Sequence, residues 1–428
     1  MKIGILGGGL SGLVLAYYLK DKAEVVEREK ECGGLCRSLK QDGFTFDYGG
    51  AHIIFSRDKQ PIDFMRGILG ANCGSGKREN KIFYKGNFVK YPFENGLYDL
   101  LPQDRFECLY YYLTKQNKKP NDFKEWMYCT FGQGIADKYL IPYNEKIWKT
   151  KAEKLSLKWV NGRIPEPPLE DVIKSAVGVT TEGYTHQLNF YYPKKGGIQS
   201  LISNLEKEAP RIVKDFEVKK ICKENGSWLI SNEKISKKYD LLVSTIPLFD
   251  LLDALDGIPK KVQDALNGLR YNSLITVMLG IDAEKLLDYT AVYFPDKKTL
   301  FHRLGFPKIF SPFNVPVGKT SVVTEITAME GSSLWKLSDK QIEKQVIDDL
   351  NSLNIIDKKK ICFAKVKRFK YAYVVYDKDY YKNVKIVRDF VKKWGIILCG
   401  RFAEFEYLNM DECVNRASKL AKELKKEM

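Results

Sequence analysis

The first fifty residues contain a glycine-rich turn between a predicted strand and a predicted helix. Residues 2–6 are a short apolar run, which predicts a buried parallel strand. The turn Gly7-Gly8-Gly9-Leu10-Ser11-Gly12 follows, and residues 11–20 are predicted to form a helix. In such a unit Gly7 permits a tight turn, Gly9 lets the backbone approach a pyrophosphate, and Gly12 lets the helix pack on the strand. The pattern therefore predicts a Rossmann-like α/β sheet whose helix N-terminus faces a dinucleotide.

An acidic residue closes the second predicted strand. Residues 23–27 form this strand and end with Glu27, fifteen residues after Gly12. A carboxylate at this place accepts the ribose hydroxyls of an adenosine and repels a 2′-phosphate. FAD or NAD is therefore favoured over NADP, and the alternative is a glycine-rich turn that binds no ligand.

Composition limits the class of protein. The 428 residues are enough for roughly two or three domains, and the 44% hydrophobic and 29% charged content is ordinary for a globular chain. No apolar run approaches about eighteen residues, so we expect no membrane span. The first strand begins directly after Met1, which leaves no room for a signal peptide, so we expect a cytoplasmic protein. Nine cysteines without CxxC pairs predict reduced thiols and no metal site.

The chain carries a net charge of +16, which raises the question of nucleic-acid binding. The lysines are spread along the sequence, and no basic tract dominates. We therefore expect no nucleic-acid partner. The charge is consistent with attraction of a small polyanionic substrate such as a nucleotide diphosphate.

A second glycine motif distinguishes between FAD and NAD. Gly33-Gly34-Leu35-Cys36-Arg37 follows Glu27-Arg28, and a predicted strand near the C-terminus ends in Gly400-Arg401. These segments resemble the FAD-dependent amine-oxidase-like flavoprotein superfamily, which implies bound FAD with Arg37 against its diphosphate or flavin edge. The cofactor-binding residues that the resemblance implies are Gly7, Gly9, Ser11, Gly12, Glu27, Arg28, Gly34, Leu35, Arg37, Gly50, Gly400, Arg401, Tyr407 and Asn409.

The predicted fold class is α/β, with a discontinuous Rossmann-like FAD-binding domain, a helical insert and an antiparallel-sheet substrate domain. Helical spacing marks the insert, and residues 273–281 and 321–328 alternate like half-buried antiparallel strands. We expect residues 1–65, 186–259 and 393–428 to form the FAD-binding domain, residues 66–185 the helical insert on the nucleotide side, and residues 260–392 a mixed sheet domain that covers flavin and substrate.

Several downstream segments resemble, in order, the UDP-galactopyranose mutase family, most closely its eukaryotic-type branch. The segments are Tyr91-Pro92-Phe93-Glu94-Asn95, the motif over residues 142–148 with Asn144 and Trp148, and Tyr293 followed ten residues later by Arg303. The family usually has Gln where this chain has Glu94, and a carboxylate only accepts hydrogen bonds, so whether the base is uracil stays open.

The resemblance implies a substrate site built for a diphosphate. Arginine forks and phenol hydroxyls match phosphate oxygens. His52 would lie beside the flavin, and Arg163 and Arg303 would stabilise the leaving diphosphate, so these three are the expected catalytic residues. The expected substrate contacts are Tyr91, Phe93, Glu94, Asn144, Trp148, Arg163, Tyr293, Arg303, Tyr373 and Tyr407.

The function that the resemblance implies is a mutase that interconverts pyranose and furanose forms of a UDP-sugar, most directly UDP-galactose. It would act through a flavin N5–sugar adduct with FAD in its reduced form, with NAD(P)H or another reductant as a partner, in cell-surface polysaccharide biosynthesis. Two alternatives stay open: an FAD-dependent oxidoreductase of the amine-oxidase or protoporphyrinogen-oxidase type, and a flavin- or nucleotide-binding protein without catalysis. The sequence leaves the sugar, the source of electrons and the oligomeric state open.

Overall fold

A five-stranded parallel sheet forms one half of the computed structural model, which describes residues 1–160, 164–183 and 188–427. Three separate stretches of the chain supply its strands, and this discontinuous Rossmann-like arrangement confirms the predicted fold class. In spatial order the strands are β19 (Ile397–Leu398), β13 (Leu241–Ser244), β1 (Ile3–Leu6), β2 (Ala23–Val26) and β9 (Ile212–Val213).

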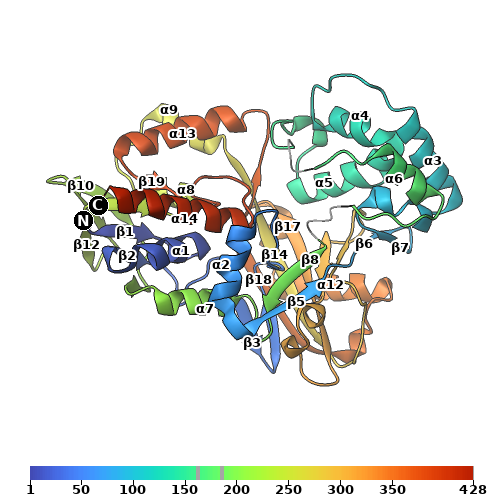
Figure 1. The fold of residues 1–428 in the computed structure, drawn as a ribbon, viewed down its shortest axis with the longest axis horizontal. Helices are drawn as coiled ribbons and strands as arrows, with labels where there is room; N and C mark the ends of the chain where they lie inside the picture. Colours follow the sequence, from blue (N-terminus) through green and yellow to red (C-terminus); the bar gives the residue numbers. More distant parts are fainter. Residues whose placement is uncertain (161–163, 184–187, 428) are drawn as a thin grey trace.

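Helices and a small sheet cover the two faces of the parallel sheet. One face packs on the cluster of α1 (Leu10–Leu19), α2 (Lys59–Leu69), α7 (Gln199–Glu208) and α14 (Met410–Lys426), where α1 and α14 lie side by side (Figure 1). The other face packs on β10 (Lys220–Glu224), β11 (Ser227–Ser231), β12 (Ser236–Tyr239), α8 (Leu248–Asp253), α9 (Lys260–Asn267) and α13 (Tyr380–Trp394). The two termini lie close together at the outer end of this half (Figure 1).

A seven-stranded mixed sheet forms the second half of the molecule. Its order is β18 (Ile361–Val375), β14 (Arg270–Ile281), β17 (Thr320–Ala328), β16 (Arg303–Gly305), β15 (Ala291–Tyr293), β6 (Asn80–Tyr84) and β7 (Asn87–Lys90). All neighbours in it are antiparallel except β15 and β6. Short helices α10 (Pro307–Phe310) and α11 (Ser333–Lys336) connect its strands.

The two strands expected over residues 273–281 and 321–328 pair antiparallel as β14 and β17, but they are not half-buried. Every residue of β17 is buried, as are the last ten of β14. One face of the sheet packs on α12 (Asp339–Ser352). The other packs on the hairpin of β3 (Ser38–Gln41) and β4 (Phe44–Asp47), through Phe44 and Phe46 against Met278 and Val323. Both faces are covered, so polar residues such as Thr324 are buried as well.

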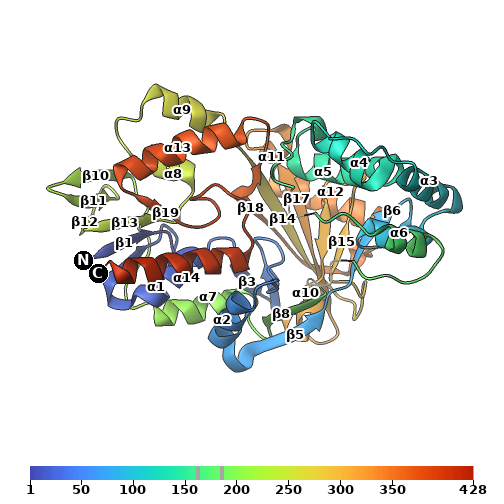
Figure 2. The same cartoon turned by 45° about the horizontal axis from the view of Figure 1, so that its top comes forward.

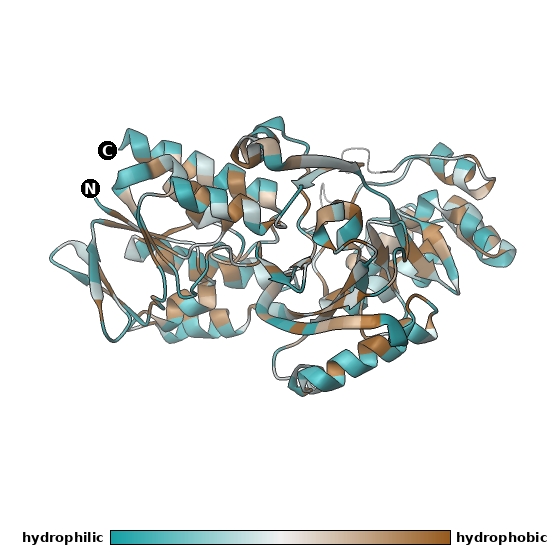
Figure 3. Ribbon diagram, turned by 90° about the horizontal axis from the view of Figure 1, so that it is seen from below, coloured by the Kyte–Doolittle hydropathy of each residue, from teal (hydrophilic) through white to brown (hydrophobic). Residues whose placement is uncertain are grey.

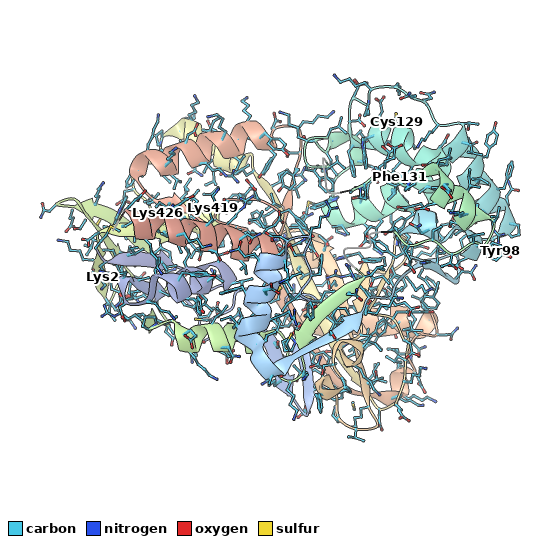
Figure 4. The ribbon with its side chains drawn as sticks, viewed as in Figure 1. Lys2, Tyr98, Cys129, Phe131, Lys419 and Lys426 are labelled. Carbon is cyan, nitrogen blue, oxygen red and sulfur yellow. The ribbon has the colours of Figure 1, made fainter. Side chains whose placement is uncertain are left out.

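The helical insert lies beside this sheet, at the end of the molecule away from the termini (Figures 1 and 2). Its helices are α3 (Pro102–Leu113), α4 (Phe123–Ile135), α5 (Ile141–Trp148) and α6 (Leu169–Ala176). Phe131 is buried among them and Tyr98 lies exposed at the outer end (Figure 4). The first part of the expected insert is extended instead, because β6 and β7 join the large sheet and β5 (Cys73–Lys77) pairs with β8 (Asn189–Pro193).

Hydrophobic residues gather on the strands and on the inner faces of the helices, whereas the outer faces of the helices are mixed or hydrophilic (Figure 3). Within residues 1–160, 164–183 and 188–427, no helix combines the length and the apolar character needed to cross a bilayer.

Candidate functional site

A cavity of about 1040 Å³ lies where the Rossmann-like half, the large sheet and the helical insert meet. This volume is at the upper end of the range for a site that holds one small molecule, roughly 300–1,000 Å³. Its lining begins at the β1–α1 turn and continues through residues 49–58, helix α5, strands β15, β16 and β18, and residues 401–413. The cavity is therefore large enough for a ligand of the size of a dinucleotide.

The glycines of the β1–α1 turn have distinct geometric roles. Gly7 has φ +100°, a conformation that favours glycine. A Cβ on Gly12 would lie 2.0 Å from the carbonyl oxygen of Gly7, so Gly12 is required for the close contact of helix and strand. A Cβ on Gly9 would meet nothing within 4 Å, and Gly9 lines the cavity. Gly9 thus leaves open the space that a pyrophosphate needs.

The acidic residue at the end of β2 lies at the cavity wall, as the fingerprint predicts. Glu27 Oε2 accepts a hydrogen bond from Gly8 N at 2.7 Å, and Oε1 accepts one from Glu29 N at 3.0 Å. The neighbouring Arg28 lines the cavity too, but its Nη1 donates to Asp250 Oδ2 at 3.1 Å. The carboxylate is therefore held at the place where an adenosine ribose would lie.

Arg37 and its glycine loop form the next part of the wall. Arg37 Nε donates to Gly34 O at 3.0 Å, and the guanidinium lies 5.5 Å from the centre of the Tyr48 ring. Leu35 and Gly34 line the same wall, and a Cβ on Gly34 would lie 3.6 Å from Gly9 Cα. The two glycine motifs therefore face each other across the same end of the cavity.

Arg401 brings a cation to the cavity. Its Nη1 donates to Leu408 O and its Nη2 to Ala372 O, both at 2.7 Å, and its guanidinium lies 4.2 Å from the Tyr407 ring centre. Among the described residues its buried Nε has no hydrogen-bond partner, and no carboxylate forms an ion pair with it. A cation without an acidic partner favours an anionic ligand.

Three further residues lie at the end of the cavity that the glycine motifs form, namely Ser11, Gly400 and Asn409. A Cβ on Gly400 would lie 2.6 Å from Ser11 Oγ, so Gly400 lets the C-terminal turn reach the N-terminus of α1. Asn409 caps α14 and lines the cavity. The open backbone at Gly9, the carboxylate of Glu27 and the guanidinium of Arg401, which has no acidic partner among the described residues, together fit a dinucleotide such as FAD.

His52 lies in the middle of the cavity wall, with Ala51 before it. Its Nδ1 lies 2.6 Å from Gly50 O, a carbonyl that only accepts, so Nδ1 carries the proton and Nε2 is the acceptor. Burial lowers the pKa of His52 to about 4, and the positive charges of Arg401 and Arg303 add to the shift. The imidazole is therefore neutral at pH 7.

Arg303 is held by a buried acid that the sequence did not point to. Pairing of β16 with β17 places Arg303 opposite Glu325, and Arg303 Nε donates to Glu325 Oε1 at 2.9 Å. Burial would lower the pKa of Arg303, but Glu325 holds it well above the usual value. Glu325 is 1% exposed, and its Oε2 has no hydrogen-bond partner among the described residues. A Cβ on Gly50 would lie 3.5 Å from Arg303 Nη2, so the arginine lies beside the His52 loop.

Aromatic side chains form the walls around Arg303. The ring centres of Tyr91 and Tyr293 are 5.0 Å apart, and those of Tyr373 and Tyr407 are 6.1 Å apart in a stacked pair. Trp148 lies 6.0 Å from Tyr407, and its Nε1 donates to Asn144 Oδ1 at 3.0 Å. The structure thus brings seven of the ten expected substrate residues to one cavity, namely Tyr91, Asn144, Trp148, Tyr293, Arg303, Tyr373 and Tyr407.

Two of the remaining expected substrate residues, Phe93 and Glu94, are not part of this lining. Arg163 lies outside the described residues. Phe93 stacks on Tyr139 at 5.1 Å, and Tyr139 stacks on the cavity residue Tyr143 at 5.3 Å, so Tyr139 lies between Phe93 and the wall. Glu94 is 4% exposed, and burial raises the pKa of its carboxyl to about 7. Roles for these three residues stay predictions.

Other cavity residues were not expected. Arg78, Tyr143 and His302 line the cavity, and none of them was assigned a role from the sequence. His302 is 2% exposed and comes directly before Arg303, but a lone histidine in an apolar segment gave no signal of its own. No group of three or more His, Cys, Asp or Glu residues in the described part of the chain could hold a metal ion.

Comparison with known proteins supports the architecture. Residues 5–82 match the family described as NAD(P)-binding Rossmann-like domain. A crystal structure of reduced UDP-galactopyranose mutase superposes with a TM-score of 0.90 at 24% identity, covering 100% of this chain and 96% of that chain. The resemblance seen in the sequence motifs is therefore confirmed at the level of the fold.

Relatives found by sequence include enzymes with other names. Protoporphyrinogen oxidase 2, chloroplastic/mitochondrial, of Arabidopsis thaliana is 23% identical over 413 residues, covering 82% of this chain and 80% of its own. Coproporphyrinogen III oxidase of Bacillus subtilis is 20% identical over 466 residues, covering 96% and 95%. The fold is thus shared with proteins whose names describe different reactions.

Proposed function

We propose that this chain is a flavin-dependent mutase that interconverts the pyranose and furanose forms of a UDP-sugar, with UDP-galactose as the first substrate to test. The observation that carries the proposal is the part of the cavity that the large sheet and helix α5 line. There Arg303, anchored by Glu325, lies among the phenols of Tyr293, Tyr373 and Tyr407 beside the predicted flavin site. The guanidinium fork of an arginine and the hydroxyls of tyrosines are donors that match the oxygens of a diphosphate.

In this proposal FAD binds between the two glycine motifs. Glu27 holds the adenosine ribose, and Arg37 and Arg401 face the anionic or polar edges of the cofactor. When bound, reduced FAD would supply the nucleophile for the anomeric carbon of the sugar. NAD(P)H or another reductant supplies its electrons. Residues 1–65, 186–259 and 393–428 hold the cofactor, residues 66–185 hold the nucleotide, and residues 260–392 cover both.

The residues of the chain bind and orient the substrate in this proposal. Charge develops on the diphosphate as its bond to the sugar breaks, and Arg303 lies fixed where it would stabilise that charge. His52 stays neutral and presents Nε2 as a hydrogen-bond acceptor beside the flavin. Trp148 and Tyr143 give the site flat apolar walls that exclude water.

The test is turnover by the reduced, FAD-loaded protein. Protein reduced with dithionite is incubated with UDP-galactopyranose, and UDP-galactofuranose is measured by chromatography, with the oxidised protein as the control. We expect product only from the reduced protein. Absence of product together with absence of UDP binding would contradict the proposal.

Arg303→Ala provides a second readout that is independent of turnover. Loss of charge-assisted hydrogen bonds should weaken UDP binding by about 1.5–3 kcal/mol, roughly tenfold to 150-fold. The titration follows flavin absorbance or heat. UDP affinity equal to that of the unmodified protein would contradict a role of Arg303 in binding diphosphate.

The alternative is an FAD-dependent oxidoreductase, which the names of the sequence relatives favour. It predicts that the protein oxidises a porphyrinogen with oxygen, which is followed by porphyrin fluorescence, and that UDP neither binds nor inhibits. Porphyrin formation without UDP binding would establish this alternative over the mutase.

A further inference from the structure

Lys146 is a buried lysine on helix α5, the helix whose Tyr143, Asn144 and Trp148 line the cavity. It is 6% exposed. Its Nζ donates to Phe294 O at 3.1 Å, to Asp296 O at 2.5 Å and to Thr299 Oγ1 at 2.9 Å. All three protons of the ammonium are thereby used. Within the described part of the chain, no carboxylate forms an ion pair with it.

The three acceptors of Lys146 belong to one connection, residues 294–302, between β15 and β16. Tyr293 ends the strand before this connection and Arg303 begins the strand after it. Lys146 therefore ties the helix of one cavity wall to the hairpin of the other. Where the walls meet, the Tyr143 and Tyr293 rings are 5.5 Å apart, edge to face.

The charge of Lys146 also reaches the cavity. His302, which lines the cavity, has a pKa held well below its usual value, first by burial and then by the positive charges of Arg303, Lys146 and Lys149. Charges in a poorly solvated interior act more strongly than charges in water. Lys146 thus adds positive potential at His302, the cavity residue directly before Arg303.

We propose that Lys146 is a positioning residue for a nucleoside diphosphate ligand: it fixes α5 against the β15–β16 connection and places a buried positive charge behind the diphosphate site. The proposal rests on the proposed function, because it takes the diphosphate as the ligand of this half of the cavity.

The proposal implies a particular pH dependence. Burial and, to a smaller extent, the charge of Lys149 lower the pKa of Lys146 to about 7, although Asp296 and Asp349 oppose the shift. The deprotonated amine has two donors in place of three and no charge, so it releases one acceptor. An anionic ligand favours the protonated form. Affinity is therefore higher below the pKa and falls as pH rises through it.

The experiment titrates UDP-galactose into the FAD-loaded protein at several values between about pH 6 and pH 8.5. Its diphosphate is a diester and keeps a constant charge over this range, and buried His302 stays neutral. For the unmodified protein we expect affinity on the order of tenfold higher at the acid end. Lys146→Met should bind on the order of tenfold more weakly at the acid end, and the pH dependence that remains in this variant belongs to other groups such as Glu94, whose pKa is about 7.

Two further variants separate positioning from charge. Thr299→Val keeps the lysine but removes one acceptor, so it should weaken binding severalfold and keep the pH dependence. Lys151→Met is the matched control, because this exposed lysine lies just after the same helix and pairs with Glu145. It should bind as the unmodified protein does.

The outcomes distinguish the inference from the proposed function. Absence of UDP-galactose binding by the unmodified protein would overturn the proposed function. Binding with Lys146→Met equal in affinity and pH profile to the unmodified protein would overturn the role of Lys146. If Lys146→Met fails to fold or to hold FAD, a flat pH profile of the unmodified protein with normal binding by Thr299→Val would overturn it equally.

Discussion

Arg303 and Glu325 form the ion pair that shapes the substrate side of the cavity. Glu325 is 1% exposed, and its second oxygen has no hydrogen-bond partner among the described residues. Removing one partner of a buried ion pair costs about 3–5 kcal/mol, because the other charge is left uncompensated. The acid is therefore as important for the position of the guanidinium as the arginine is for the ligand.

Glu325→Gln tests this role. The amide still accepts from Arg303, so we expect a loss of about 1–3 kcal/mol in the free energy of unfolding, measured by denaturant titration. UDP affinity should fall with it. Asp389→Asn is the control, because its pair with Lys385 is exposed to solvent and should contribute little to stability. Equal losses in the two variants would contradict a special role for the buried acid.

Because His52 is buried in its neutral form, it makes the free energy of unfolding depend on pH in the acidic range. Its pKa is about 4 in the folded protein and roughly 6.5 in an unfolded chain. As pH falls below about 6.5 the unfolded chain binds the proton first, so this contribution to stability is complete above that pH and is lost toward pH 4. Asp47, whose pKa burial raises to about 6, acts in the opposite direction.

The prediction for His52 is a difference between two pH profiles. Free energies of unfolding are measured from pH 7 down to about pH 4 for the unmodified protein and for His52→Gln. The unmodified protein should lose more stability over this range, because glutamine does not titrate, while Asp47 contributes equally to both. Parallel profiles would show that His52 is not held neutral.

At the scale of elements, we expect two glycines of the β1–α1 turn to differ in role: Gly12 matters for folding and Gly9 for cofactor binding. A Cβ on Gly12 collides with the Gly7 carbonyl, whereas a Cβ on Gly9 meets nothing within 4 Å. Gly12→Ala should therefore lower the melting temperature of the apoprotein strongly. Gly9→Ala should leave the melting temperature nearly unchanged, because it should change the free energy of unfolding by less than about 0.5 kcal/mol. It should still weaken FAD binding at least tenfold. Normal FAD affinity in Gly9→Ala would contradict pyrophosphate binding at this turn.

The β1–α1 turn also shows which parts of the fold can be predicted from local sequence. Strand, glycines, helix and acid lie within the first 27 residues, so local pattern was enough to predict β1, α1 and β2. The segment over residues 142–148 forms a single helix and presents Asn144 and Trp148 together for the same reason. Both predictions depend on neighbours in sequence, where propensity and spacing carry information.

Contacts between distant segments could not be predicted in this way. Arg303 meets Glu325 only because β16 and β17 pair in one register, and β17 is buried on both faces, so its pattern does not mark one residue as special. Lys146 gave no signal either, because its acceptors are backbone oxygens and a threonine about 150 residues away. Such sites depend on tertiary pairing rather than on local pattern.

For the whole molecule, positive charge is spread rather than gathered. Lys2, Lys419 and Lys426 lie on the Rossmann-like half, at the end away from the helical insert (Figure 4), and Lys2 pairs with Glu24 at 3.3 Å. A few positive charges, among them Arg303 and Arg401, line the cavity. Positive charge at the cavity favours a small anionic ligand.

The cavity joins parts of the chain that are otherwise separate, so its ligands should stabilise the whole molecule. FAD would contact the β1–α1 turn, residues 49–58 and residues 401–413 at once. A ligand that binds only the folded state adds about 2.7 kcal/mol at a concentration of 100 Kd. We expect the melting temperature of the apoprotein to rise with FAD concentration, measured by calorimetry. FMN lacks the adenosine that Glu27 would hold, so at equal concentration it should give a much smaller rise; an equal rise with FMN would contradict the role of Glu27.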